Sequence, residues 1–157
     1  MKLKRVIGFI VAIIVCELAG FIGAIFTTPS IPTWYATLSK PFFNPPSFVF
    51  APVWTLLYAL MGISLYLVWE KREKIKTKIP LVLFFFQLIL NTIWSILFFG
   101  LKNPLLAFVE IILLWITLLF TIIKFYPVSK KAALLLVPYI LWVSFASILN
   151  LAIFLLN

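Results

Sequence analysis

The sequence predicts an all-α integral membrane protein that folds as a bundle of five transmembrane helices. Of its 157 residues, 65% are hydrophobic and only 11% are charged, whereas soluble domains carry roughly 25% charged residues. Five apolar segments have approximately the length of about 20 residues that crosses a hydrocarbon core, and none shows the alternation of a transmembrane β-strand. We interpret 1–157 as one membrane domain, with helices at 6–26, 48–69, 79–99, 105–125 and 132–155.

The basic residues predict the orientation of this bundle. The net charge is +9, but the lysines and arginines form short runs between apolar segments rather than a patch that would bind nucleic acid. Eleven of the thirteen lie before the first segment, in 71–78 or in 124–131, and the other two are Lys40 and Lys102. By the positive-inside rule, the N-terminus should be cytoplasmic, and the C-terminus and the first connection should lie outside.

The residue inventory excludes several kinds of site. The chain has no histidine and a single cysteine, Cys16. Disulfides within the chain, Cys/His metal sites, histidine-ligated haem and Ser-His-Asp catalysis are therefore not available to it. We predict no metal site and no required cofactor.

The first apolar segment reads as a retained helix, because no small-residue cleavage site follows it. Small residues four apart allow another helix to approach closely, either within the bundle or in a homodimer. They are Ala19, Gly20, Gly23 and Ala24. Glu17 lies deep in the same segment, and such an intramembrane carboxyl either has a functional role or is neutral and hydrogen-bonded.

The connection at 27–47 is rich in proline and aromatic residues. Proline fixes φ and removes a hydrogen-bond donor, which predicts a stiff lid rather than a flexible linker. The lid residues are Trp34, Lys40, Pro41, Pro45 and Pro46. Asn44 is expected to cap the next helix, with Pro45 as its first residue.

The helix after the lid should have an aromatic face. Trp54, Tyr58 and Leu65 fall on one side at helical spacing, together with Met61 or Gly62. A stiff aromatic loop leading into this face indicates a pocket for a flat hydrophobic ligand. Alternatively, these aromatic residues form a belt at the membrane interface.

The third helix carries a polar strip. Gln87, Asn91 and Ser95 are four residues apart, so they share one face. Lipid cannot satisfy amide groups, and this face should point into the bundle. It either contacts a ligand or holds helices together, with Trp94 about one helical step away.

The last two helices have recognisable signals at their starts. Asn103 and Pro104 predict an N-cap and a first residue for the fourth helix, and Glu110 suits the positive end of its dipole. Pro138 should kink the fifth helix. Beyond it, Trp142, Ala146 and Asn150 share a face that leaves room between helices.

Taken together, these motifs resemble those of the TspO/MBR family, the tryptophan-rich sensory proteins related to the mitochondrial translocator protein. The blocks occur in family order from the lid to the last helix. They are Trp34-Tyr35-x2-Leu38-x-Lys40-Pro41, Pro45-Pro46, Pro52-x-Trp54-x3-Tyr58-x3-Gly62, Gln87-x3-Asn91-x2-Trp94-Ser95 and Pro138-Tyr139-x2-Trp142-x2-Phe145-Ala146-x3-Asn150.

The resemblance implies a five-helix bundle, often dimeric, that binds porphyrins such as protoporphyrin IX and haem, as well as benzodiazepine-type drugs. Trp54 and Trp142 are then expected to face a macrocycle from two sides of a space under the lid. The ligand-binding residues implied are Tyr35, Trp54, Tyr58, Gln87, Asn91, Trp94, Trp142, Phe145 and Ala146. The chain departs from the sterol-recognition pattern of some members, since no basic residue follows Tyr139.

Three functions are compatible with these features. The first is a membrane receptor or sensor for tetrapyrroles. The second is a light- and oxygen-dependent enzyme that degrades porphyrin, with Trp54 and Trp142 as electron donors or quenchers. The third, a tetrapyrrole or sterol transporter, is favoured least, because the chain lacks the internal repeat of alternating-access transporters.

Overall fold

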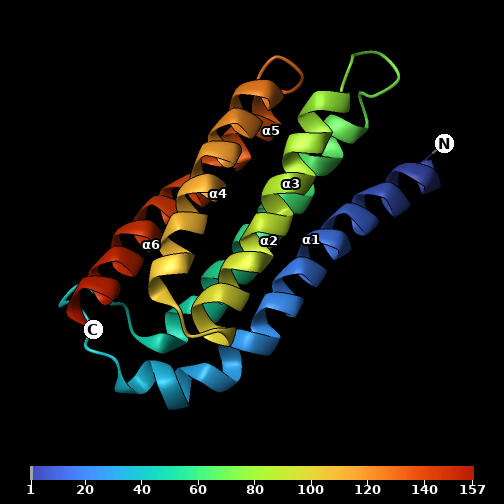
Figure 1. Ribbon diagram of the computed structural model, residues 1–157. Coiled ribbons are helices and arrows are strands. Elements are labelled where there is room, and N and C mark those ends of the chain that lie inside the picture. Colours follow the sequence, from blue (N-terminus) through green and yellow to red (C-terminus); the bar gives the residue numbers. More distant parts are fainter. Residues whose placement is uncertain (1) are drawn as a thin grey trace.

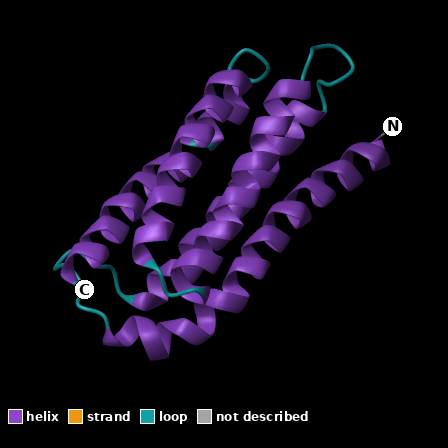
Figure 2. Cartoon of the chain, in the orientation of Figure 1, coloured by secondary structure: helices purple, strands orange, loops and turns teal. Residues whose placement is uncertain are grey.

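The computed structural model describes residues 2–157 and confirms an all-α bundle with five helical segments long and apolar enough to span a membrane (Figure 1). Within these residues no strand occurs, and short loops join the helices (Figure 2). The spans are Leu3–Tyr35, Ser47–Trp69, Lys78–Gly100, Pro104–Phe125 and Lys130–Leu156.

The first helix is longer than the sequence predicted. Helix α1 (Lys2–Ser30) continues into the π-helical turn η1 (Ile31–Tyr35), so Trp34 is helical rather than part of a loop. Prolines at 29 and 32 lack N–H donors, and a π turn accommodates such a gap in the hydrogen-bond ladder. Thr33 Oγ1 also donates to the carbonyl of Pro29 at 2.7 Å.

The non-helical part of the lid is correspondingly short, at residues 38–46. Asn44 does not cap the next helix, so that prediction was wrong. Its Oδ1 accepts from the Tyr35 hydroxyl at 2.6 Å, and its Nδ2 donates to the carbonyl of Pro45 at 3.1 Å. Pro46 is extended, with ψ of 141°, and helix formation begins only at the 3-10 turn η2 (Ser47–Val49), which leads into α2 (Phe50–Trp69).

The next two spans follow the predicted pattern closely. Helix α3 (Lys78–Ser95) ends in a second π turn, η3 (Ile96–Gly100). Asn103 caps α4 (Pro104–Phe125) by accepting a hydrogen bond from the Leu106 N–H at 3.0 Å, as predicted.

The fifth span is divided near Pro138, which confirms the expected kink. Its parts are α5 (Lys130–Leu135) and α6 (Val137–Leu156), separated at Leu136. A proline at 138 has no N–H to donate to the carbonyl four residues earlier. The two parts therefore pack differently: α5 lies against α2, whereas α6 lies against α4.

The helices form a ring around two apolar clusters. Helix α1 packs on α2 and α3, α3 packs on α4, and α4 packs on α6. Helices α2 and α6 meet through aromatic rings, with Trp54 against both Trp142 and Tyr139. The larger cluster has members on all five spans, and a smaller cluster around Tyr35, Phe98 and Phe99 lies near the lid.

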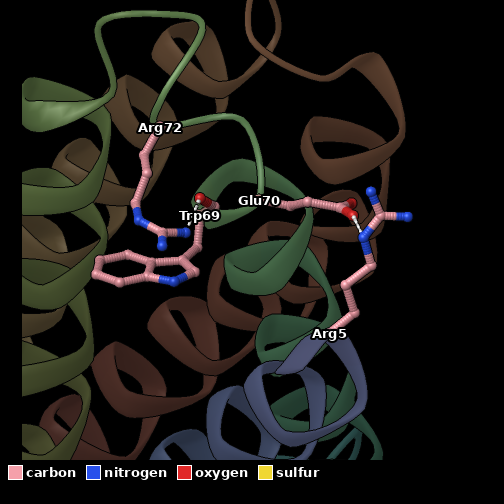
Figure 3. Close-up of polar contacts among 4 residues, drawn as sticks. All are labelled: Arg5, Trp69, Glu70 and Arg72. Atoms are coloured by element: carbon pink, nitrogen blue, oxygen red, sulfur yellow. Dashed lines mark hydrogen bonds and ion pairs between the residues drawn. The ribbon is translucent and has the colours of Figure 1, made fainter. Parts of the chain in front are cut away.

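The two ends of the bundle differ in charge. The N-terminus and both basic connections lie at one end, whereas the C-terminus and the lid lie at the other (Figure 1). At the basic end Arg5 Nε lies 3.4 Å from Glu70 Oε1, and the Arg72 guanidinium lies 4.4 Å from the ring centroid of Trp69 (Figure 3). The segments expected in the cytoplasm thus share one end.

Candidate ligand-binding cavity

A cavity of about 340 Å³ lies in the lid-side half of the bundle, between α1, α2, α3 and α6. The spacing of the residues on each helix explains its lining. Phe50, Trp54 and Tyr58 are four residues apart on α2, so their rings project from one face. On α6, Trp142 and Ala146 are also four residues apart, so both side chains face the cavity.

Most of the residues singled out from the sequence meet in this cavity. Those in its wall are Tyr35, Trp54, Tyr58, Trp94, Trp142, Phe145 and Ala146. Sequence reasoning missed several other lining residues, although their helical spacing from Trp54 and Ala146 could have indicated some of them. Those that complete the aromatic and apolar wall are Phe50, Phe98, Phe99, Leu149 and Ile153.

The two indoles expected to face each other across a space are instead in contact. The ring centroids of Trp54 and Trp142 are 6.5 Å apart with planes at 89°. This is an edge-to-face pair, and it leaves no room for a macrocycle between the rings. Trp54 and Trp142 therefore form one corner of the cavity, and a flat ligand has to lie against that corner.

Small residues bring α1 close enough to complete the wall. A Cβ atom at Gly20 would lie 2.4 Å from Cε2 of Tyr58, and one at Gly23 would lie 3.0 Å from Oγ of Ser95. Both glycines line the cavity. The small-residue pattern of α1 is thus used, at these two positions, for packing within the bundle.

Gln87 and Asn91 face the bundle interior, as predicted, but they are not in the cavity wall. They belong to a buried chain of hydrogen bonds behind it. The Tyr58 hydroxyl donates to Asn91 Oδ1, Asn91 Nδ2 donates to the Tyr139 hydroxyl at 2.6 Å, and that hydroxyl donates to Gln87 Oε1 at 2.9 Å. Their amides therefore position Tyr58 rather than line the space beside it.

A second polar link fixes the opposite wall. Trp94 Nε1 donates to Asn150 Oδ1 at 3.0 Å, and Asn150 Nδ2 donates to the carbonyl of Pro104 at 2.7 Å. These two bonds join α3, α6 and the start of α4. Asn150 itself lines the cavity, a role that its place on the Trp142 face could have suggested.

The non-helical part of the lid, at 38–46, lies outside the cavity lining and is held at three places. The Tyr35 hydroxyl donates to Asn44, and the Phe43 ring meets Phe145 at a centroid distance of 6.3 Å. The third is a pair of hydrogen bonds to the last residue: Asn157 Oδ1 accepts from the Ser39 N–H and Asn157 Nδ2 donates to the Ser39 carbonyl, both at 3.0 Å.

The Lys40 side chain lies over the Tyr35 ring and does not line the cavity. Its Nζ donates to the carbonyl of Leu38 at 3.0 Å and lies 4.9 Å from the ring centroid of Tyr35. Pro41, Pro45 and Pro46 also lie outside the lining residues. Of the residues in 27–47, those that line the cavity are Thr27, Thr28, Ile31, Tyr35 and Ser47.

The two intramembrane carboxyls occupy different places. Glu17 lines the cavity, whereas Glu110 does not. Glu110 is only 9% exposed, and both of its carboxyl oxygens lack a hydrogen-bond partner. The Trp142 indole N–H is likewise buried without a partner.

The cavity is open on the side between α1 and α2. Phe21, Ala24, Ala51 and Thr55 line it and are themselves exposed at the surface of the bundle. These residues lie within two membrane-spanning segments. The opening therefore faces the bilayer rather than either aqueous side.

Comparison with known proteins identifies relatives along nearly the whole chain. The model of the TspO/MBR family matches residues 12–156. The tryptophan-rich protein TspO of Archaeoglobus fulgidus is 49% identical over 157 residues, covering 100% of this chain and 99% of its own length. That of Chlorobaculum tepidum is 46% identical, covering 98% of each chain. The translocator protein of Bos taurus is 38% identical over 136 residues, covering 85% of this chain and 80% of its own.

Proposed function

The chain belongs to the TspO/MBR family, and on this basis we propose that it is a membrane receptor or sensor for tetrapyrroles, such as protoporphyrin IX and haem, and for similar flat hydrophobic ligands. The observation that carries this proposal is the aromatic cavity between α1, α2, α3 and α6. Its volume of about 340 Å³ is in the range of small-molecule sites, which are roughly 300–1,000 Å³, mostly apolar and supplied with a few polar groups.

Aromatic contact would supply most of the affinity. A ring pair contributes about 0.5–1.5 kcal/mol beyond the burial of its area. The corner formed by Trp54 and Trp142 offers two ring surfaces at nearly a right angle. A planar ligand can lie flat on one indole and meet the other with its edge.

Recognition would depend on ring shape rather than on an axial metal ligand. The sequence contains no histidine, which is the usual proximal ligand of haem iron, although tyrosine can replace it. Tyr35 and Tyr58 are both in the wall. Metal-free protoporphyrin IX is therefore expected to bind about as well as haem.

Titration with protoporphyrin IX in nanodiscs tests the proposal. Trp54→Phe and Trp142→Phe should each raise Kd by about threefold to tenfold, which corresponds to roughly 0.7–1.4 kcal/mol. Trp115→Phe is the matched control, because Trp115 lies on α4 outside the cavity lining. An unchanged Kd in both cavity variants would contradict the site.

The contact between Trp54 and Trp142 also favours a second candidate, photo-oxidative degradation of the bound porphyrin. In this reaction the photoexcited ring is oxidised and molecular oxygen is reduced, and the two indoles 6.5 Å apart in the wall would act as quenchers that direct the reaction of the bound ring. Illumination in air would then give a product spectrum that depends on the protein and is lost in Trp54→Phe and Trp142→Phe. Bleaching equal to that of free porphyrin would argue against it.

A further inference from the structure

Among the residues that the structure describes, Glu17 is the one with a formally charged side chain in the wall of the cavity. At about 1.5 Å of rise per residue, it lies roughly 20 Å along α1 from Leu3, well inside the membrane. Within residues 2–157 there are two ion pairs, Arg5–Glu70 and Arg72–Glu73, and neither involves Glu17. Intramembrane carboxyls are costly and generally pair with another group, yet no partner for this one is present in the described chain.

No basic side chain can reach Glu17 from the neighbouring elements. Among the described residues, the lysines and arginines lie at helix ends or in connections, and none lines the cavity. Along α1 the nearest is Arg5, roughly 18 Å away along the axis and turned toward Glu70 (Figure 3). Lys40 is held at the lid by backbone carbonyls.

The hydroxyl next to Glu17 does not supply a donor either. Tyr58 contacts α1 one turn away, at Gly20, and is the first member of the hydrogen-bond chain behind the wall. Its hydroxyl proton is directed to Asn91, away from the cavity. The inner end of the cavity, at Glu17 and Tyr58, therefore presents hydrogen-bond acceptors and no cation.

We propose that Glu17 determines the charge selectivity of the cavity: its inner end takes a ligand edge that carries an amine or another N–H donor, and it disfavours an edge that carries a carboxylate. This inference rests on the proposed function. An ammonium group supplies the countercharge that the carboxyl lacks. An anion at the same place would lose its hydration with no cation in the wall to replace it.

The proposal also gives the direction in which an acidic ring binds. The cavity extends from Glu17 and Tyr58 at its inner end to Tyr35 at the lid. A tetrapyrrole with both carboxylates on one edge would bind with that edge toward the lid, where the Lys40 ammonium lies over the Tyr35 ring. Flat amines would bind in the opposite sense, with the basic group inward.

Three probes of nearly equal shape test this selectivity: the cationic 9-aminoacridine, neutral acridine and the anionic acridine-9-carboxylate. Their binding is measured by equilibrium dialysis against nanodiscs that hold the protein, with empty nanodiscs to subtract partitioning into lipid. The wild-type protein should bind the amine about tenfold or more tightly than the carboxylate. In Glu17→Gln this ratio should fall to about one, while the Kd for acridine changes by less than about twofold.

Two further variants make the test specific. Glu110→Gln makes the same change at a buried carboxyl outside the cavity, so the ratio should remain as in the wild type. Glu17→Asp keeps a carboxyl, so the preference for the amine should remain. A wild-type ratio near one, or an unchanged ratio in Glu17→Gln, would overturn the proposal.

Failure of the proposed function gives a different result. If acridine and protoporphyrin IX bind but Glu17→Gln leaves the ratio unchanged, the cavity is a ligand site and only the role of Glu17 is wrong. If neither acridine nor protoporphyrin IX binds above the level of empty nanodiscs, both proposals are overturned.

Discussion

At the scale of single residues, the shape of the cavity depends on Gly20. The missing side chain lets α1 approach the Tyr58 ring so closely that an added Cβ would lie 2.4 Å from Cε2. The ring cannot easily move aside, because its hydroxyl is hydrogen-bonded to Asn91 and its centroid lies 5.7 Å from the ring centroid of Trp54. Any atom added at Gly20 must therefore displace the wall.

Gly20→Ala should consequently weaken both the fold and ligand binding. Overpacking of this kind costs about 1–3 kcal/mol, and we expect a lower midpoint of thermal unfolding in detergent together with a higher Kd for protoporphyrin IX. Gly8→Ala is the matched control on the same helix, because its Cβ would lie at an ordinary 3.5 Å from Tyr66. Equal behaviour of the two variants would contradict the role of Gly20.

The hydrogen-bond chain behind the wall gives a second prediction at this scale. Tyr139→Phe removes a fully buried hydroxyl that accepts from Asn91 and donates to Gln87. Each buried polar group left without a partner costs about 1–3 kcal/mol. Thermal unfolding monitored by circular dichroism should show this loss, whereas Tyr126→Phe, at a tyrosine that is 51% exposed, should show almost none.

The same chain shows where reasoning from the sequence ends. Helical spacing was enough to place Gln87 and Asn91 on an inward face. It could not show whether their amides would meet a ligand or other side chains, because that depends on Tyr139, about fifty residues away in sequence, and on the length of the Tyr58 side chain. Periodicity predicts the direction of a side chain but not its contact partner.

At the scale of elements, the lid behaves as a short cover fastened to the end of α6. The amide of Asn157 pairs with both the N–H and the carbonyl of Ser39, and it joins residues 118 positions apart. The Asn157 side chain thus makes the two hydrogen bonds that a residue of a neighbouring β-strand would make with Ser39. Opening of the lid requires that both bonds break.

Asn157→Ala should therefore make the lid open more readily. Two hydrogen bonds of about 1 kcal/mol each correspond to an increase of up to about thirtyfold in the equilibrium constant for opening, and partial exposure to water should reduce this to several-fold. Hydrogen–deuterium exchange of the lid amides, followed by mass spectrometry, measures the rate of exchange. Ser39→Ala is the control, because only the backbone of Ser39 takes part, and an equal rate in both variants would contradict the role of Asn157.

The elements themselves were largely predictable, apart from the lid. The number and type of spans, the Asn103 cap and the break near Pro138 all follow from local signals that the structure confirms. The first helix is longer than predicted, because it continues past the prolines at 29 and 32 into a π turn that accommodates their missing N–H groups. The prediction also assigned Asn44 to a cap, although Tyr35 uses its oxygen.

At the scale of the whole molecule, the structure separates two ends that the charge pattern distinguishes. The basic connections gather at the end of the N-terminus, and the lid and C-terminus form the other end (Figure 1). Since cytoplasmic loops carry an excess of lysine and arginine, the cavity should be covered on the outer side of the membrane. The cover and its Asn157 contact would then be exposed to the external medium.

Labelling of single cysteines tests this orientation. In a Cys16→Ser background, Phe42→Cys on the lid and Lys74→Cys in the first basic loop each place a thiol at an exposed position. A membrane-impermeant maleimide added to intact spheroplasts should label the lid thiol and should label Lys74→Cys only after the cells are permeabilised. The reverse pattern would show the opposite orientation.

The gap between α1 and α2 affects how an affinity for this protein should be expressed. A hydrophobic molecule that enters through Phe21 and Thr55 comes from the acyl chains, so the relevant quantity is its mole fraction in the lipid rather than its aqueous concentration. An apparent dissociation constant then changes with the volume of lipid or detergent in the assay. Two laboratories with different lipid-to-protein ratios would obtain the same intrinsic constant only after both divide out the partition coefficient.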